Sequence, residues 1–244
     1  SQSAFHMGIY YEPSIVYKLS SLARCYPEYR LNLYAALSKY AFKTGHIYWG
    51  YRFLGWSLHY LQDLTQPYHS TIAPGISTST LVFYAALDFI GIQTPQSNLI
   101  QLVVDRHFSL ENYAFYMFEG LVKTNKTSDM LEAIQDTSQD ALYPKYDAHY
   151  PRDVVAKQSF DKANAINAAI MASLPHKYVM ESKYIFYVTE QTPPNLFLLE
   201  ERQSHAPSSE LPDQLKGIFQ AFGSHTRNFV NYVLNQTKKD TESP

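Results

Sequence analysis

Residues 46–64 constrain the fold of this chain more than any other segment. On a helix they place apolar or aromatic side chains, such as those of Trp49 and Trp56, on nearly every side. A helix that is apolar all round has to be covered by other helices, so we expect this one at the centre of a domain. Gly50 and Gly55 each weaken a helix by about 1 kcal/mol, which predicts close approach of neighbouring helices at both points.

Helical periodicity recurs along the chain, and no stretch alternates long enough to predict a strand. The 244 residues can bury one sizeable core. We therefore predict an all-α fold of about eight to ten helices in a single multi-helix domain over residues 1–244, with a disordered tail at 237–244. The expected helices span about residues 31–42, 46–64, 80–91, 97–123, 127–142, 153–173, 175–188 and 215–236.

Two side chains of the predicted central helix can share a metal ion. His59 and Asp63 stand four residues apart, which places both on one face of a helix. Pro67 cannot continue that helix, because its ring removes a donor and clashes one turn back. The chain therefore turns, and His69 can come back toward the same place.

A later helix repeats the spacing, with His107 four residues before Glu111. One such pair arises often by chance, and an isolated buried histidine usually bonds a backbone carbonyl. Two pairs with a third histidine after a helix break instead indicate a cluster for more than one divalent ion, built on the buried central helix. Asp105 could orient a ligand imidazole from behind. We expect surface or hydrogen-bonded polar positions for His46, His149, His176, His205 and His225.

These motifs resemble the zinc-dependent phospholipase C family, bacterial phosphatidylcholine-hydrolysing enzymes related to zinc-dependent single-strand nucleases. The family pattern is His-Tyr-x-Gly/Thr-Asp, then Pro-x-His, then His-x-x-x-Glu on a later helix. Its counterparts here are His59–Asp63, Pro67–His69 and His107–Glu111, with Gln62 where the family has Gly or Thr. By a shorter match, His6 falls on a further family histidine.

The resemblance implies two or three zinc ions held by six side chains. The implied ligands are His6, His59 and Asp63 for one ion, and His69, His107 and Glu111 for another. The family also binds zinc through its mature amino terminus, which has no counterpart before His6, so we expect the sequence to begin inside the domain. We assign no catalytic residue beyond the metal ligands.

By the same resemblance, the chain would hydrolyse the phosphodiester of a phospholipid such as phosphatidylcholine to diacylglycerol and a phosphorylated head group. Metal-activated water would attack the phosphorus. The implied partner is the phospholipid substrate with transient membrane-surface contact and no stable protein partner, and the implied location is secreted or periplasmic. The alternatives are a zinc-dependent single-strand nuclease or other phosphoesterase, and a non-catalytic helical domain that binds metal or lipid.

Composition bears on these alternatives. The charge is nearly balanced, with 20 basic and 22 acidic residues, which argues against tight nucleic-acid binding. Cys25 is the only cysteine, so no intrachain disulfide can form. The most apolar run, 81–92, is shorter than the about 20 residues that a membrane span needs. Segment 70–106, longer than in the short bacterial enzymes, could be a lid or acyl-chain rest beside the metals, or a packing hairpin.

Overall fold

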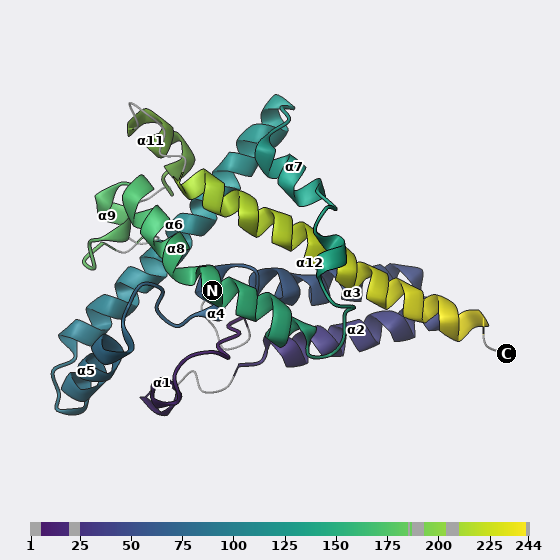
Figure 1. The fold of residues 1–244 in the computed structure, drawn as a ribbon, viewed down its shortest axis with the longest axis horizontal. Helices are drawn as coiled ribbons and strands as arrows, with labels where there is room; N and C mark the ends of the chain where they lie inside the picture. Colours follow the sequence, from purple (N-terminus) through teal and green to yellow (C-terminus); the bar gives the residue numbers. More distant parts are fainter. Residues whose placement is uncertain (1–5, 20–24, 185, 187–192, 204–209, 243–244) are drawn as a thin grey trace.

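The computed structural model describes residues 6–19, 25–184, 186, 193–203 and 210–242, most of which are helical (Figure 1). No strand occurs within these residues, which confirms the predicted all-α class. None of the helices in this part of the chain is both long and apolar enough to cross a membrane. The bounds are α1 (Ser14–Leu19), α2 (Pro27–Lys43), α3 (Ile47–Asp63), α4 (Pro67–Ser70), α5 (Thr78–Phe89), α6 (Thr94–Thr124), α7 (Asp129–Gln135), η1 (Asp140–Leu142), η2 (Pro151–Ala156), α8 (Lys157–Ser173), α9 (His176–Val179), α11 (Leu196–Gln203) and α12 (Glu210–Glu242).

The first long hairpin pairs α2 with α3. α2 begins at Pro27, whose missing N–H is no loss in the first turn of a helix. It ends at Lys43, and Gly45 then takes a φ of +77°, in the left-handed region that favours glycine. The chain can therefore reverse into α3, whose bounds lie within one residue of the predicted 46–64.

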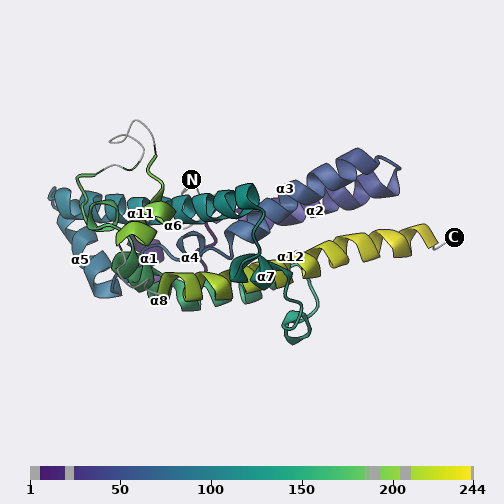
Figure 2. The same ribbon diagram turned by 90° about the horizontal axis from the view of Figure 1, so that it is seen from above.

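α3 is not the buried central helix that its apolar sequence predicts. Its buried residues form one narrow stripe, and α3 packs against α2 and α12. The large side chains on its other sides are 40–66% exposed: Ile47, Tyr48, Trp49, Tyr51 and Trp56. Figure 2 shows the reason, because the α2–α3 hairpin projects from the rest of the molecule and no described helix covers its outer side.

The two glycines of α3 have different surroundings. A Cβ at Gly50 would lie 2.5 Å from the Phe42 ring, and the Ser38 hydroxyl donates to the Gly50 carbonyl at 2.8 Å. The prediction of close helix approach is therefore confirmed at Gly50. At Gly55 no atom lies within 4 Å of the added Cβ, so the same prediction is wrong there.

A second hairpin pairs α5 with the first half of α6, and α5 also contacts α1. Gly91, with a φ of +90°, lies in the turn between the two helices. Segment 70–106 thus forms a helical hairpin whose tip lies at the amino-terminal end of α6 (Figure 1). His107 and Glu111 lie further along the same helix, at its middle.

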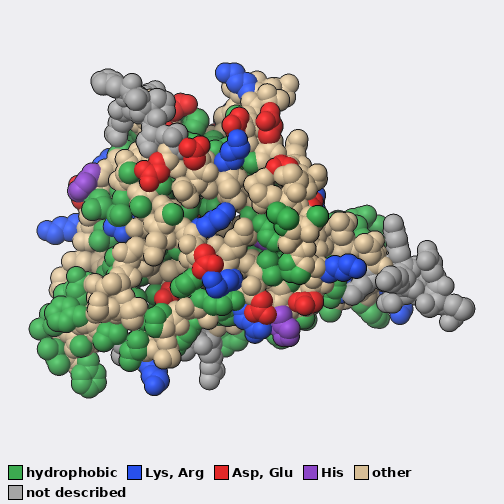
Figure 3. Space-filling view, viewed as in Figure 1, with side chains coloured by type: hydrophobic (Ala, Val, Ile, Leu, Met, Phe, Trp, Pro, Cys, Tyr) green, Lys and Arg blue, Asp and Glu red, His purple; other side chains and the backbone are tan. Residues whose placement is uncertain are grey.

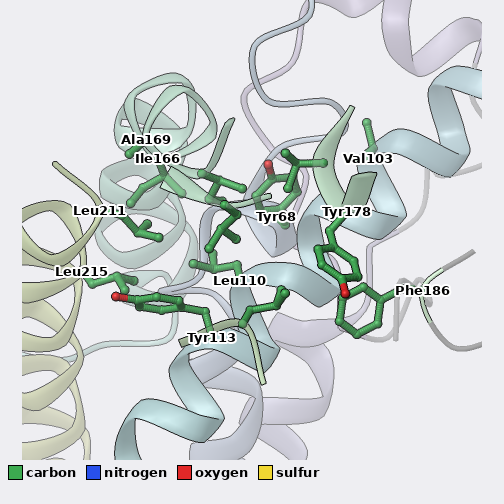
Figure 4. Close-up of a cluster of buried hydrophobic side chains, with 14 of the residues drawn as sticks. Tyr68, Val103, Leu110, Tyr113, Ile166, Ala169, Tyr178, Phe186, Leu211 and Leu215 are labelled. Carbon is green, nitrogen blue, oxygen red and sulfur yellow. The ribbon is translucent and has the colours of Figure 1, made fainter. Parts of the chain in front are cut away.

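Two apolar clusters hold the helices together, and α12 contributes to both. The larger cluster joins α4, α6, α8, α9, α11 and the start of α12, with Tyr68, Tyr113 and Ile166 fully buried (Figure 4). The smaller cluster joins α2, α3, η2 and the later part of α12, around Leu61 and Phe229. Because one continuous helix crosses both clusters, the described residues form a single domain.

Three later boundaries differ from the predictions. The helix expected over 127–142 is divided into α7 and η1. In the turn between them the Asp136 side chain accepts a hydrogen bond from the Ser138 N–H. The helix expected over 175–188 ends at Val179, and part of that range lies outside the described residues. α12 continues to Glu242, so most of the segment 237–244, expected as a disordered tail, is helical. Residues 237–243 contain no glycine or proline, so nothing in that sequence stops the helix.

Candidate metal centre

A short turn between α3 and α4 brings His69 back toward α3. α3 ends at Asp63, and Pro67 occupies the first turn of α4, where its missing N–H needs no partner. The Gln66 side chain accepts a hydrogen bond from the Tyr68 N–H at 2.5 Å and caps the new helix. The predicted helix break and chain reversal are therefore confirmed.

His6, His59 and Asp63 form a first triad near the surface. His6 Nδ1 lies 2.6 Å from Asp63 Oδ2, and His59 Nε2 lies 3.5 Å from the same oxygen. The two imidazole rings meet edge to face, with centroids 5.1 Å apart. The side chain of His59 is 57% exposed, against 24% for His6 and 17% for Asp63. One possible ligand atom from each residue lies within 4.8 Å of the other two.

His69, His107 and Glu111 form a second triad between α4 and α6. His107 Nε2 lies 3.2 Å from His69 Nε2 and 2.9 Å from Glu111 Oε1, and His69 Nε2 lies 3.6 Å from that oxygen. Two atoms that bind a tetrahedral ion at about 2.0–2.2 Å lie roughly 3.3–3.6 Å apart, so these separations resemble those of a zinc site. The histidine side chains are 5% and 0% exposed and that of Glu111 is 40% exposed, so the triad opens to solvent on its carboxylate side.

The amino-terminal segment joins the two triads. The Gly8 N–H donates to the His69 carbonyl at 2.7 Å, and His69 Nδ1 donates to the His6 carbonyl at 3.1 Å. A carbonyl can only accept, so Nδ1 carries the proton and Nε2 presents its lone pair to the second triad, as a metal ligand must. The His6 and His69 ring centroids are 6.5 Å apart. All six predicted ligands therefore lie in two adjacent triads.

The protonation states of the second triad suit a divalent cation. Burial alone would raise the pKa of the Glu111 carboxyl, but the adjacent ring nitrogens of His107 and His69, which can carry a proton when no ion is bound, hold that pKa well below its usual range. Burial lowers the pKa of His107, although the hydrogen bond to Glu111 acts in the opposite direction. An ionised carboxylate beside a neutral imidazole is the combination that binds zinc.

Tyr68, Arg106 and Asn167 support the second triad from behind, and the sequence analysis did not identify them. The Tyr68 ring stacks on His107 with centroids 5.8 Å apart, and its hydroxyl donates to Asn167 Oδ1 at 2.9 Å. The buried Arg106 donates to the same oxygen at 3.2 Å and to the Val179 carbonyl at 2.8 Å. The sequence signal that could have found this network is the spacing of Asn167, which shares a helix face with the apolar Ala163 and Ile170.

Asp105 does not orient His107, contrary to the expectation from sequence. Its carboxylate accepts hydrogen bonds from Gln101 Nε2 at 2.9 Å and from the Phe186 N–H at 3.1 Å. Positions two apart on a helix point about 200° apart, so Asp105 and His107 face opposite sides of α6. Burial raises the pKa of the Asp105 carboxyl.

The histidines outside the triads that lie within the described residues occupy the polar positions expected of them. His225 is buried, and its ring nitrogens are satisfied by the Tyr150 hydroxyl at 2.8 Å and Gln158 Oε1 at 3.0 Å. His176 is 73% exposed. His205 lies outside the described residues.

The two triads together offer four imidazoles and two carboxylates, the ligand types that zinc takes in proteins. Ions held about 3.5–4 Å apart can stabilise both the attacking and the leaving oxygen of a phosphoester displacement. Asp63 has a second carboxylate oxygen with which it could face a neighbouring ion. No protein-family model, curated protein or solved structure matches this chain.

Proposed function

We propose that this chain is a zinc-dependent phosphodiester hydrolase of the phospholipase C type. It would cleave a phospholipid such as phosphatidylcholine and release diacylglycerol and a phosphorylated head group. The observation that carries the proposal is the second triad, in which two imidazole nitrogens and a carboxylate oxygen converge within 2.9–3.6 Å. The motif resemblance to the phospholipase C family supports the choice of reaction.

Two or three zinc ions would be bound by the six triad side chains. Zinc supplies positive charge to a phosphate and lowers the pKa of water from 15.7 to about 7, which makes hydroxide available at neutral pH. Glu111 and His59 are the most exposed members of their triads, so the phosphodiester would approach on their side. The buried His69 and His107 close the opposite side to water.

The proposed partner is the phospholipid itself, met transiently at a membrane surface, and no stable protein partner is needed. The proposed location is secreted or periplasmic, as in the family that the motifs resemble. The nearly balanced overall charge supports a neutral lipid over a polyanion as substrate.

A single-strand nuclease is the second candidate, and the α2–α3 hairpin favours it. Proteins that bind single strands combine basic groups with aromatic side chains on which bases stack. The Trp49, Phe53 and Trp56 rings follow one side of α3 toward the first triad. These rings pack on one another with centroids 5.7 and 5.5 Å apart, which leaves less ring face for a base. Between Tyr29 and Gln62 the charged residues are all basic: Arg30, Lys39, Lys43 and Arg52.

The test is an assay of the purified chain on phosphatidylcholine and on single-stranded DNA, each with and without a zinc chelator. We expect diacylglycerol release that chelator abolishes and added zinc restores. Glu111→Ala should abolish that release. His176→Gln, which changes an exposed histidine outside the triads, should leave it unchanged.

The other outcomes separate the alternatives. Chelator-sensitive cleavage of DNA without phospholipid hydrolysis would identify the nuclease. Binding of zinc without turnover on either substrate would identify a non-catalytic metal-binding domain. Activity that persists in chelator would overturn the proposal, because the triads would then have no part in the reaction.

A further inference from the structure

α5 is an apolar helix that buries none of its side chains. After its first turn its residues are mainly apolar, including Phe83, and yet none of them is buried within the described residues. Its packing is limited mainly to one side, along α6 and α1. A helix of a soluble protein normally turns its apolar stripe to the core. α5 packs Leu81 and Tyr84 against the larger cluster, but it also presents apolar surface outward, with Phe83 59% exposed.

The exposure is greatest at the tip where α5 turns into α6. Phe89 is 91% exposed, Ile90 67% and Ile92 49%. The turn is fixed by hydrogen bonds from the Gly91 N–H to the Asp88 carbonyl and from the Ile92 N–H back into the last turn of α5. In Figure 3, hydrophobic side chains gather at the end of the molecule where Figure 1 places α5. The tip is an apolar projection held by backbone hydrogen bonds.

Charge distinguishes this tip from the other projecting hairpin. Asp88 is the only charged residue between Ser70 and Val104. The α2–α3 hairpin, in contrast, carries four basic residues between Tyr29 and Gln62. A convex projection whose single charged side chain is the half-buried Asp88 gains little from a charged partner. Its apolar side chains suit the boundary between lipid head groups and acyl chains, where apolar faces lie about 5–10 Å deep.

A second copy of the chain is a weaker match for the tip. A projection needs a complementary apolar recess, and the chain has a cavity of about 320 Å³ between α6, α7 and α12. Asp129, Asp213 and Lys216 line part of that cavity, and Lys216 already pairs with Asp129 at 3.0 Å. Docking the apolar tip there would remove water from these charged groups and offer them no new polar partner.

We propose that the α5–α6 tip is a membrane anchor, in which Phe89, Ile90 and Ile92 enter the interfacial layer of a phospholipid bilayer. The first half of α6 would act as a strut, because the helix spans about 20 Å from Thr94 to His107. This distance exceeds the depth of insertion, so the second triad would stay outside the bilayer while the tip is inserted. The choice of a phospholipid surface rests on the proposed function.

The test is sedimentation with phosphatidylcholine vesicles in the presence of chelator, so that binding is measured without hydrolysis. The triple variant F89S/I90S/I92S should bind the vesicles at least about tenfold more weakly than the unmodified chain. Its far-UV circular dichroism should be unchanged, because the three side chains are exposed. A matched double variant, V122S/L142S, removes apolar side chains that are 75% and 77% exposed elsewhere, and should bind normally. About 1 M salt should not weaken binding, since that ionic strength screens only charge interactions.

Several outcomes would overturn the anchor. One is the absence of binding to phosphatidylcholine vesicles, and another is an equal loss of vesicle binding in V122S/L142S. A third is binding that requires anionic lipid and disappears in salt, because that dependence would point to the basic α2–α3 hairpin. A dimer in solution that the triple variant dissociates would assign the tip to a second copy.

The proposed function fails or stands independently of the anchor. Glu111→Gln should bind vesicles normally but not hydrolyse phospholipid. The triple variant should retain hydrolysis of a dispersed short-chain phosphatidylcholine, which requires no bilayer. Tip-dependent vesicle binding without hydrolysis by the unmodified chain would support the anchor and overturn the function.

Discussion

The two triads present nearly the same ligand types in different surroundings. In the first, His6 comes from the segment before α1 and His59 from α3, and their side chains are 24% and 57% exposed. In the second, His69 and His107 are 5% and 0% exposed and lie against the core. Burial, and not ligand chemistry, is therefore the main difference between them.

Burial changes what each triad requires. Polar groups at the surface can take water as a partner, whereas His69 and His107 need each other, a carboxylate or an ion. The second triad is also held by packed elements, with Tyr68 stacked on one of its rings. Ligands held in place lose less freedom on binding an ion. We therefore expect the second triad to bind zinc more tightly and to carry more of the reaction.

Removing one ligand from each triad should give the largest difference. Glu111→Ala should lose one zinc and at least about a hundredfold in turnover, since even the outer partners of metal ligands are worth 10–100-fold. His59→Ala removes a proposed ligand that is 57% exposed, and should cost only about tenfold. Elemental analysis and phosphatidylcholine turnover measure both effects. Wild-type turnover in Glu111→Ala would remove the second triad from the reaction.

His225 shows what burial costs a histidine outside both triads. Burial, together with the Lys162 charge, lowers its pKa to about 4, while the unfolded chain has a histidine pKa near 6.5. The unfolded state therefore binds the proton more readily, and stability falls as pH drops from about 6.5 toward 4. Between pH 7 and about 4.5 the loss should be about 2–3 kcal/mol.

Denaturant unfolding of zinc-free wild type and His225→Gln at the two pH values measures this contribution. Glutamine can keep a hydrogen bond to Tyr150 or Gln158 but does not take up a proton in this range. The variant should lose less stability on acidification, by about the same 2–3 kcal/mol. Equal losses in both proteins would show that His225 does not resist protonation, and burial would then explain less of the contrast between the triads.

The sequence predicted which side chains come together better than it predicted their surroundings. The spacings of His59 to Asp63 and of His107 to Glu111 act within single helices, and the break at Pro67 acts within one turn, so local rules were sufficient. The exposure of Trp49 depends on whether any helix other than α2 and α12 covers α3. A local sequence pattern does not contain that information. The interpretation of α3 as a central helix was wrong for that reason.

The support behind the second triad was also beyond the reach of local patterns. Asn167 acts because α8 lies beside α4, where its side chain meets Tyr68, and because α6 turns Arg106 toward it. These three residues lie far apart in sequence and follow no motif. Asp105 was expected to orient His107 because it is close in sequence. A spacing of two residues instead puts the two side chains on opposite sides of the helix.

Asn167→Leu should weaken the second triad selectively. It leaves the Tyr68 hydroxyl and one Arg106 nitrogen without their shared acceptor, which should cost about 2 kcal/mol in free energy of unfolding. Zinc at the second triad should bind more weakly, with zinc at the first triad unchanged. The matched control is Asn164→Leu, on the exposed side of α8, where one hydrogen bond to the Gly75 N–H is lost. Similar losses in both variants would contradict a specific support.

The smallest expected effect is the difference in zinc affinity within the unmodified chain. A chelator titration followed by elemental analysis should remove zinc in two steps, the first triad before the second. The midpoints should differ at least about tenfold, which corresponds to about 1.4 kcal/mol. His59→Ala should abolish the early step and Glu111→Ala the late one. A single step in the unmodified chain would mean that the two triads bind their ions as one cooperative cluster, and that the buried and exposed sites are not energetically separate.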